Sequence, residues 1–207
     1  KIYAFLAKEL KKDSKTCLIT ESQAWAKRIE QNFPVYFLND AAYLNDVVVQ
    51  GEAPDDTFRP NQIYVLSLPF SLLKKKEEKQ IFEAIQQHLF TPYGLRTLKE
   101  DHEAFKPIYQ GDQWNRDTAY HQGTIWPFLL GAYYTAQLKL YRNTKKLRAE
   151  ILENIQVLEN HFYNSDGIHC ISEIFDGSDP SDGRGTIQQA WSISALLQVF
   201  YNHDLLR

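Results

Sequence analysis

The pattern of hydrophobic and polar positions along the chain predicts a protein built almost entirely from helices. Apolar residues recur at helical spacing in seven segments, and prolines and glycines separate these segments. The predicted helices are residues 1–12, 21–33, 61–73, 77–90, 125–141, 147–163 and 187–201. In the second helix Trp25, Ile29 and Phe33 are expected on the buried side, and Pro34 is expected to end it.

Three long segments between the helices show no strong periodicity: residues 34–60, 91–124 and 164–186. Short extended pieces are expected at 43–49 and 167–171, and no β-hairpin is indicated. Long loops in a compact domain are usually either functional or disordered. The Tyr and Trp residues within 91–124 favour a functional loop.

Two kinds of helix alternate along the chain. Helices 61–73, 125–136 and 187–200 are apolar nearly all round, which predicts burial, whereas 77–90 and 145–163 are amphipathic and should face solvent. Alternating inner and outer helices predict an all-α fold of the (α/α) barrel type. About seven helices amount to roughly the second half of such a barrel, so residues 1–207 are treated as one partial domain. A helical-repeat solenoid would show a uniform repeat period and short loops, which this chain lacks.

A polar and aromatic segment precedes each predicted inner helix. These segments are residues 55–61, 116–127 and 183–191. Helix N-termini present free N–H groups and a partial positive charge. Aromatic faces beside fixed polar groups suit a sugar, which has an apolar side and many hydroxyls. The sequence therefore predicts one carbohydrate pocket surrounded by helix starts.

Composition narrows the class of protein. Hydrophobic residues make up 43% and charged residues 24% of the 207 residues, which is typical of a soluble globular domain with a sizeable core. The net charge of −3 argues against a nucleic-acid partner. No apolar run reaches transmembrane length and the N-terminus lacks a secretory pattern, so a cytoplasmic protein without a membrane partner is expected.

The cysteine and histidine positions do not indicate a metal or redox site. Cys17 and Cys170 lack metal-ligand or redox spacing, and two reduced thiols are a simpler interpretation than a disulfide. His121 has no ligand partners at suitable spacing, and His169 beside Cys170 is not a zinc motif. Neither a metal nor a cofactor is expected.

With these residues placed, the chain resembles the C-terminal catalytic domain of glycogen debranching enzymes, the amylo-α-1,6-glucosidase type. The matching blocks run in family order and cover about residues 40–200, while 1–39 match only as generic helices. The blocks are RPNQ at 59–62, LSLP at 66–69, TPYGLRTL at 91–98, Tyr109 with Gly111, RD at 116–117, AYHQGTIWP at 119–127 with Gly131, SEIFDG at 172–177 and QAWS at 189–192.

The resemblance implies a six-hairpin (α/α)6 barrel glycosidase. It implies hydrolysis, with inversion, of α-1,6-glucosidic branch points in glycogen or related α-glucans. It also implies that the upstream half of the barrel, including the Asp general acid, lies outside this chain. The isolated chain is therefore expected to be inactive or nearly so.

Glu173 is the best candidate for a catalytic residue. Inverting glycosidases use two carboxyl groups roughly 6.5–9.5 Å apart, so that a water fits between the base and the sugar. By resemblance, the position of Glu173 before the last inner helix suits the general base. From the residues alone, a loop carboxylate satisfied by backbone N–H groups is the favoured interpretation. Asp117 and Asp112 are alternatives, although Asp117 is expected to pair with Arg116.

Tyr120, His121, Gln122 and Trp126 are expected to line the glucose pocket. Trp126 offers a stacking face, and His121 and Gln122 offer groups that bind hydroxyls.

Other polar residues have two interpretations each. Arg59 and Arg96 are candidates either for binding hydroxyls or for bracing loops, and Asp55 or Asp56 would then pair with Arg59. Gln189 is a candidate for the pocket, whereas Trp191 is expected in the core. The loop residues Asp176 and Asp182 are expected to form turns.

Two alternatives to the hydrolase remain open. One is a non-catalytic helical fragment that binds carbohydrate or another protein, and the other is a barrel of the glucoamylase or trehalase type. The expected partner is a branched α-glucan. Because a half-barrel exposes apolar helix surface at its cut edges, the missing N-terminal half of the barrel or a second copy of the chain is also expected as a partner.

Overall fold

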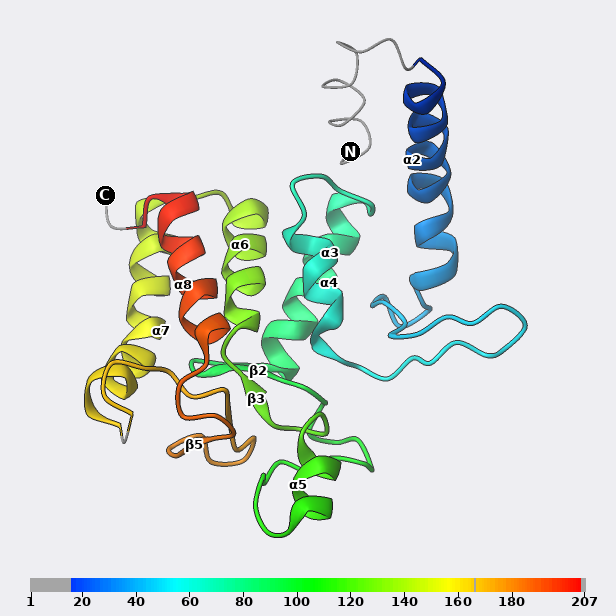
Figure 1. Ribbon diagram of the computed structural model, residues 1–207. Coiled ribbons are helices and arrows are strands. Elements are labelled where there is room, and N and C mark those ends of the chain that lie inside the picture. Colours follow the sequence, from blue (N-terminus) through cyan, green and yellow to red (C-terminus); the bar gives the residue numbers. More distant parts are fainter. Residues whose placement is uncertain (1–15, 166, 206–207) are drawn as a thin grey trace.

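The computed structural model describes residues 16–165 and 167–205, and it describes the side chains from residue 20 onward. The helix predicted at 1–12 lies outside the described residues. Within them the chain is mostly helical, and a small sheet lies at one end of the helices (Figure 1). The predicted helical class is thus confirmed, whereas the closed barrel stays a prediction.

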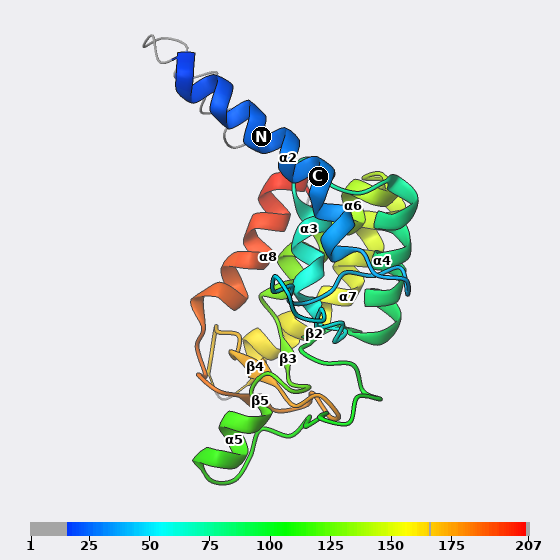
Figure 2. The same ribbon diagram turned by 90° about the vertical axis from the view of Figure 1, so that its right-hand side faces the viewer.

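The first described helix, α2 (Thr16–Phe37), projects away from the rest of the molecule (Figure 2). Among its side chains from residue 20 onward, Phe33 and Phe37 near the C-terminal end pack on the core. The prediction that Trp25 and Ile29 are buried is wrong, because these side chains are 49% and 47% exposed. Pro34 does not end the helix either. It lacks one N–H, but its own carbonyl accepts from the N–H of Leu38 at 3.1 Å, so one more turn forms.

The segment predicted as one helix over 61–73 is shorter and divided. It forms a 3-10 turn η2 (Pro60–Gln62) and a short helix α3 (Ile63–Ser67). Leu68 has an extended backbone, with φ −57° and ψ 147°, as expected for a residue that precedes a proline. Helix α4 (Lys75–His88) follows, and the side chain of Glu77 accepts from the N–H of Lys74 at 2.8 Å at its start.

Three longer helices complete the helical part: α6 (Leu129–Tyr141), α7 (Lys145–Asn164) and α8 (Ala190–His203). Helix α6 is buried nearly all round, as predicted, and packs between α3 and α8. At Gly131 a Cβ would lie 3.0 Å from the Cβ of Ala195, so a glycine allows α6 and α8 to approach closely.

Helix α8 is less buried than predicted for an inner helix. Ser192, Leu196 and Val199 are buried, but Leu197 and Tyr201 on another face are 59% and 87% exposed. The apolar composition of α8 therefore leaves an apolar face open on the described molecule.

The sheet was not predicted from the sequence. Its strands are β1 (Phe90–Thr91), β2 (Gly94–Arg96), β3 (Ile125–Trp126), β4 (Ile174–Phe175) and β5 (Gly183–Arg184), paired antiparallel in chain order. The helix predicted at 125–141 instead begins at Leu129, after β3. The long loop 91–124 also contains a helix, α5 (Gln113–Ala119).

The two short extended pieces predicted from the sequence had different outcomes. Isolated bridges join Leu38 to Leu44 and Val47 to Asp55, which confirms extended backbone within 43–49. Residues 167–171 form a turn and irregular backbone rather than a strand.

Lys139 of α6 is a polar anchor within the helix layer. Its Nζ donates to the carbonyl oxygens of Leu66 and Leu68, both at 3.0 Å, where α3 ends before Pro69. The same Nζ lies 3.5 Å from the carboxylate of Glu78, which is 3% exposed. One cation therefore satisfies the carbonyls at the end of α3 and compensates a buried charge on α4.

We expect Lys139→Met to lower the free energy of unfolding by about 3–5 kcal/mol, because it leaves the Glu78 carboxylate buried without a cation. Urea denaturation followed by circular dichroism measures this change. The double variant Lys139→Met/Glu78→Leu removes both charges and should recover a large part of the loss. Equal stability of Lys139→Met and the unaltered chain would contradict the role of this contact.

Candidate functional site

Glu173 lies at the centre of the candidate site, directly before β4, and is only 9% exposed. Its backbone N–H donates to the carbonyl of Thr186 at 2.9 Å, which joins the segment before β4 to the segment before α8. The residue is thus held by its main chain as well as by its side chain.

Three donors bind the carboxylate of Glu173. The hydroxyl of Tyr120 donates to Oε1 at 2.7 Å, and the amide Nε2 of Gln189 approaches the same oxygen at 3.4 Å. The backbone N–H of Thr186 donates to Oε2 at 3.1 Å. Hydrogen bonds to a charged acceptor are among the strongest in proteins. Because both oxygens are engaged, the orientation of the carboxyl group is fixed.

Gly185 is required for this arrangement. It has a positive φ of +68°, and a Cβ at this position would collide with Oε2 of Glu173. A glycine alone avoids both the strain of this backbone conformation and the collision. The glycine therefore allows the N–H of Thr186 to approach the carboxylate.

Tyr120 follows α5 and connects two segments of the site. Burial, and next the hydrogen bond to Glu173, raise the pKa of its hydroxyl above the ordinary value. The hydroxyl therefore keeps its proton and donates a hydrogen bond to Glu173. The carbonyl of Tyr120 accepts from Nε1 of Trp126 at 3.2 Å, which fixes the backbone of the turn.

An open cavity of about 380 Å³ lies beside Glu173. Its walls come from three separate parts of the chain and are formed by Tyr109, Arg116, Asp117, Tyr120, Glu173, Gly185 and Thr186. The volume falls within the range of small-molecule sites. Two carboxylates and two phenol rings in one cavity offer acceptors for hydroxyls and aromatic faces for a sugar ring.

The alternative carboxylates have different environments. Asp117 lines the cavity with Glu173, and the Arg116 guanidinium beside it donates to the carbonyl of Gly111 at 3.3 Å. Asp112 caps α5 by accepting from the N–H of Asn115 at 2.9 Å. Asp117 is therefore a cavity residue, whereas Asp112 has a role at the start of a helix.

Arg59 braces the turn that carries the predicted pocket residues. Its Nη1 donates to the carbonyls of Thr97 at 3.1 Å and His121 at 2.7 Å, and its Nη2 donates to Oε1 of Gln122 at 2.8 Å. The carboxylate of Asp46 lies 3.7 Å from Nε. The expected pairing of Arg59 with Asp55 or Asp56 is wrong. The side-chain oxygen Oδ1 of Asp55 instead accepts from the backbone N–H of Thr57 at 2.9 Å.

Arg96 also braces the backbone. Its Nε donates to the carbonyl of Gly177 at 3.0 Å, and the Glu100 carboxylate lies 2.8 Å from Nη2. The guanidinium thus joins β2 to the turn between β4 and β5.

Trp126 and His121 stack on each other beside the site. The ring centroids are 5.2 Å apart and the planes differ by 15°. Trp126 is only 4% exposed, so its ring packs inside the described molecule instead of offering an open face. His121 is exposed overall, although protein atoms cover part of its imidazole. This partial desolvation is the larger cause that lowers the pKa of the imidazole, and the positive charge of Arg59 is the smaller one.

Two further expectations were wrong. Trp191 is not in the core, since it is 42% exposed and stacks on Phe128 with centroids 5.0 Å apart. Asp176 is not a turn former. It is buried, accepts from the N–H of Tyr109 at 2.7 Å and pairs with Arg184 at 2.9 Å. This buried carboxylate positions Tyr109 at the cavity.

Residues of the three polar and aromatic segments contact one another: Arg59 contacts Gln122, and Trp126 lies 5.9 Å from Trp191 between ring centroids. The residues that line the cavity beside Glu173 come from the second and third segments, and none comes from 55–61. Sequence reasoning missed Tyr109, Gly185 and Thr186 as site residues. Tyr109 stood within one of the family blocks, and the other two stood within the segment 183–191, but no local signal distinguished them from turn residues.

The described residues contain neither a candidate metal-binding cluster nor a candidate membrane-spanning helix. No group of three or more His, Cys, Asp or Glu in this part of the chain is placed to hold a metal ion. No helix within the described ranges has both the length and the apolar composition needed to cross a membrane. Cys170 is a buried free thiol.

Comparison with known proteins identifies the family of this chain. The family model described as Amylo-alpha-1,6-glucosidase matches residues 1–198, and the match thus includes residues 1–39, in which no family block was identified. The chain is also 24% identical over 196 residues to the glycogen debranching enzyme of Saccharomyces cerevisiae. That alignment covers 80% of this chain but 12% of the relative. Since the family model spans nearly the whole chain, the protein belongs to the amylo-alpha-1,6-glucosidase family.

Proposed function

We propose that this chain supplies the general base and part of the glucose pocket of an inverting α-1,6-glucosidase that acts on branch points of glycogen or related α-glucans. The observation that carries the proposal is the Glu173 carboxylate, oriented by three donors in the wall of an open cavity of about 380 Å³. Membership in the family and the similarity to a glycogen debranching enzyme support the substrate class.

In this mechanism Glu173 accepts a proton from a water molecule in the cavity. The water oxygen attacks the anomeric carbon from the face opposite the leaving group, and the configuration inverts. The leaving oxygen receives its proton from a general acid, which we assign to an Asp outside this chain. Tyr120, Gln189 and the N–H of Thr186 keep the carboxylate aimed at the water.

Other residues of the pocket bind the sugar or support the residues that bind it. We assign Asp117 and Arg116 to the substrate hydroxyls, because both line the cavity. His121 and Gln122 follow Tyr120 in the chain but do not line this cavity, and we assign them to hydroxyl binding only if the substrate extends beyond it. Arg59, Arg96 and Trp126 act indirectly. Arg59 and Trp126 donate to carbonyls of the turn after α5, and Arg96 donates to the carbonyl of Gly177 between β4 and β5.

The same cavity also fits the alternative function, a domain that binds carbohydrate without cleaving it. The two functions differ in what Glu173 does, because a binding domain needs only its shape and hydrogen bonds. A barrel of the glucoamylase or trehalase type differs in substrate, and activity on linear maltooligosaccharides or trehalose in preference to limit dextrin would indicate it. A glycogen-like substrate would place the protein in the cytoplasm.

We expect Glu173→Gln to lower the rate of glucose release from limit dextrin by about 10²–10⁴-fold, because the amide cannot accept the proton of the water. The measurement uses the longer protein that contains both carboxyl groups. Glu153→Gln, an exposed position on α7, is the matched control and should retain full turnover. Near-normal turnover of Glu173→Gln would eliminate the assignment of the base.

Tyr120→Phe should keep the ring contacts of Tyr120 but remove its hydrogen bond to Glu173. A hydrogen bond to a charged group contributes about 1.5–3 kcal/mol, so we expect kcat to fall about tenfold or more while KM changes little. Tyr163→Phe, on the exposed surface of α7, serves as the control in the same limit-dextrin assay. A larger change in KM than in kcat would show that Tyr120 acts in substrate binding instead.

The isolated 207-residue chain should release no measurable glucose, since a base without its acid supports little turnover. We propose that the missing N-terminal half of the barrel, or a second copy of the chain, covers the exposed apolar face of α8. Size-exclusion chromatography with light scattering should then show association of the isolated chain. A stable monomer at all concentrations tested, or clear debranching by this chain alone, would argue against the half-barrel interpretation.

A further inference from the structure

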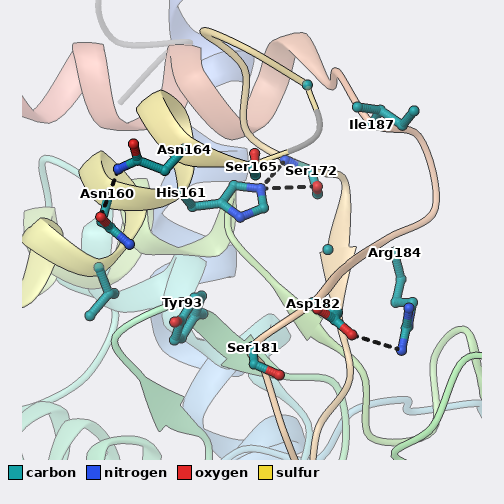
Figure 3. A pocket seen from close by; sticks show the side chains of 13 residues that line it. Tyr93, Asn160, His161, Asn164, Ser165, Ser172, Ser181, Asp182, Arg184 and Ile187 are labelled. Atoms are coloured by element: carbon teal, nitrogen blue, oxygen red, sulfur yellow. Dashed lines mark hydrogen bonds and ion pairs between the residues drawn. The ribbon is translucent and has the colours of Figure 1, made fainter.

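A second cavity, of about 450 Å³, lies against the segments around β4 and β5 and the end of α7 (Figure 3). Neighbouring residues line opposite cavities: Ser172 and Arg184 line the second, whereas Glu173 and Gly185 line the first. The two cavities are therefore back to back, separated by the segments around β4 and β5.

Neutral polar side chains dominate the lining of the second cavity. Asn160 and Asn164 project from the last turns of α7, and the amide nitrogen of Asn164 donates to Oδ1 of Asn160 at 2.8 Å. Ser172 and Ser181 add hydroxyl groups, and Tyr93 adds an aromatic ring (Figure 3). Amides and hydroxyls both donate and accept, as the hydroxyls of a sugar require.

Hydrogen bonds and close packing hold the residues at the base of the cavity. His161 is 9% exposed, and its Nε2 lies 3.1 Å from Oγ of Ser172, which joins α7 to the segment before β4. A Cβ at Gly183 would collide with the side chain of Ser172, so the glycine allows β5 to lie directly against it. Tyr93 packs on the buried ring of Phe175, with centroids 4.9 Å apart. These contacts hold the polar groups in place before a ligand arrives.

The charges around the cavity disfavour an anionic ligand. Arg184 is the cation among the lining residues, but its Nε lies 2.9 Å from the carboxylate of Asp176 and its Nη2 lies 3.8 Å from that of Asp182. One guanidinium thus faces two carboxylates. A phosphate would meet net negative charge, whereas a neutral polyhydroxyl ligand would meet a balanced polar surface.

We infer that this second cavity binds glycosyl units of an α-glucan and gives the polymer a second point of attachment behind the Glu173 site. The class of ligand rests on the proposed function, but the binding itself requires no catalysis. A branched polymer that engages two sites on one domain gains avidity, because the second contact forms at a high effective concentration. Short oligosaccharides would occupy each site separately.

The test compares the double variant Asn160→Ala/Asn164→Ala with the unaltered chain. Both positions are exposed on α7 and alanine favours helix, so the variant should fold, which circular dichroism checks. Gln156→Ala removes an amide from the same helix outside this cavity and is the matched control. Hydrogen exchange measured by mass spectrometry, with maltotetraose as the probe, locates binding. Affinity electrophoresis in gels containing limit dextrin measures the affinity for the polymer.

We expect maltotetraose to protect residues 157–165 in the unaltered chain and in Gln156→Ala, but not in the double variant. The affinity for limit dextrin should fall about tenfold or more in the double variant, since two amide contacts are lost. Protection confined to residues 109–120, around the first cavity, would overturn the inference. So would the absence of protection at 157–165, or its appearance with inorganic phosphate in place of the oligosaccharide.

The outcomes also separate this inference from the proposed function. If 157–165 are protected but Glu173→Gln debranches normally, the second site stands and the catalytic assignment fails. If Glu173→Gln is inactive but the double variant binds limit dextrin with unchanged affinity, the catalytic assignment stands and the second site fails.

Discussion

The arrangement of the site depends on the guanidinium of Arg59. This group joins the loop at Asp46, the backbone after β2 at Thr97, and the turn at His121 and Gln122. A planar group with five donors can make these contacts together, whereas the single ammonium of a lysine cannot. The turn after α5 has no regular secondary structure of its own, so tertiary contacts set its position. These are the contacts of Arg59, the packing of Trp126, and the hydrogen bonds that join Thr97 to Gly123 and Thr124.

The position of the turn then decides what surrounds Glu173. Tyr120 immediately precedes the residue whose carbonyl Arg59 binds, and its hydroxyl reaches the carboxylate at 2.7 Å. The remaining donors, Thr186 and Gln189, come from the segment that starts α8. Segments that lie on both sides of Glu173 in the sequence, at Tyr120 and at Thr186 to Gln189, therefore share one carboxylate. Gly185 makes this possible, because any side chain there would occupy the place of Oε2.

The short sheet gives the molecule two polar faces at one end of its helices. Glu173 and Ser172 are neighbours in sequence but line different cavities, and the pairing of β4 with β5 holds both in place. The buried carboxylate of Asp176 joins this region, because it pairs with Arg184 and accepts from the backbone N–H of Tyr109. Polar groups at this end are thus largely committed to one another, which keeps the cavity walls rigid. The apolar face of α8 forms a separate surface along the helices.

The sequence by itself determined the helices with strong periodicity, α4, α6, α7 and α8, within a few residues at each end. From its family blocks it also predicted Glu173 as the central residue of a site shared by the segments 55–61, 116–127 and 183–191. The structure places residues of the last two segments around one cavity with Glu173, whereas 55–61 contributes no lining residue. Only the tertiary structure decided the five strands, since pieces of two or three residues show no period and exist through long-range pairing. It also decided that Arg59 binds Asp46, that Asp176 is buried and that Trp126 packs inside. The partners of a polar side chain depend on distances in space, which spacing along the chain does not specify.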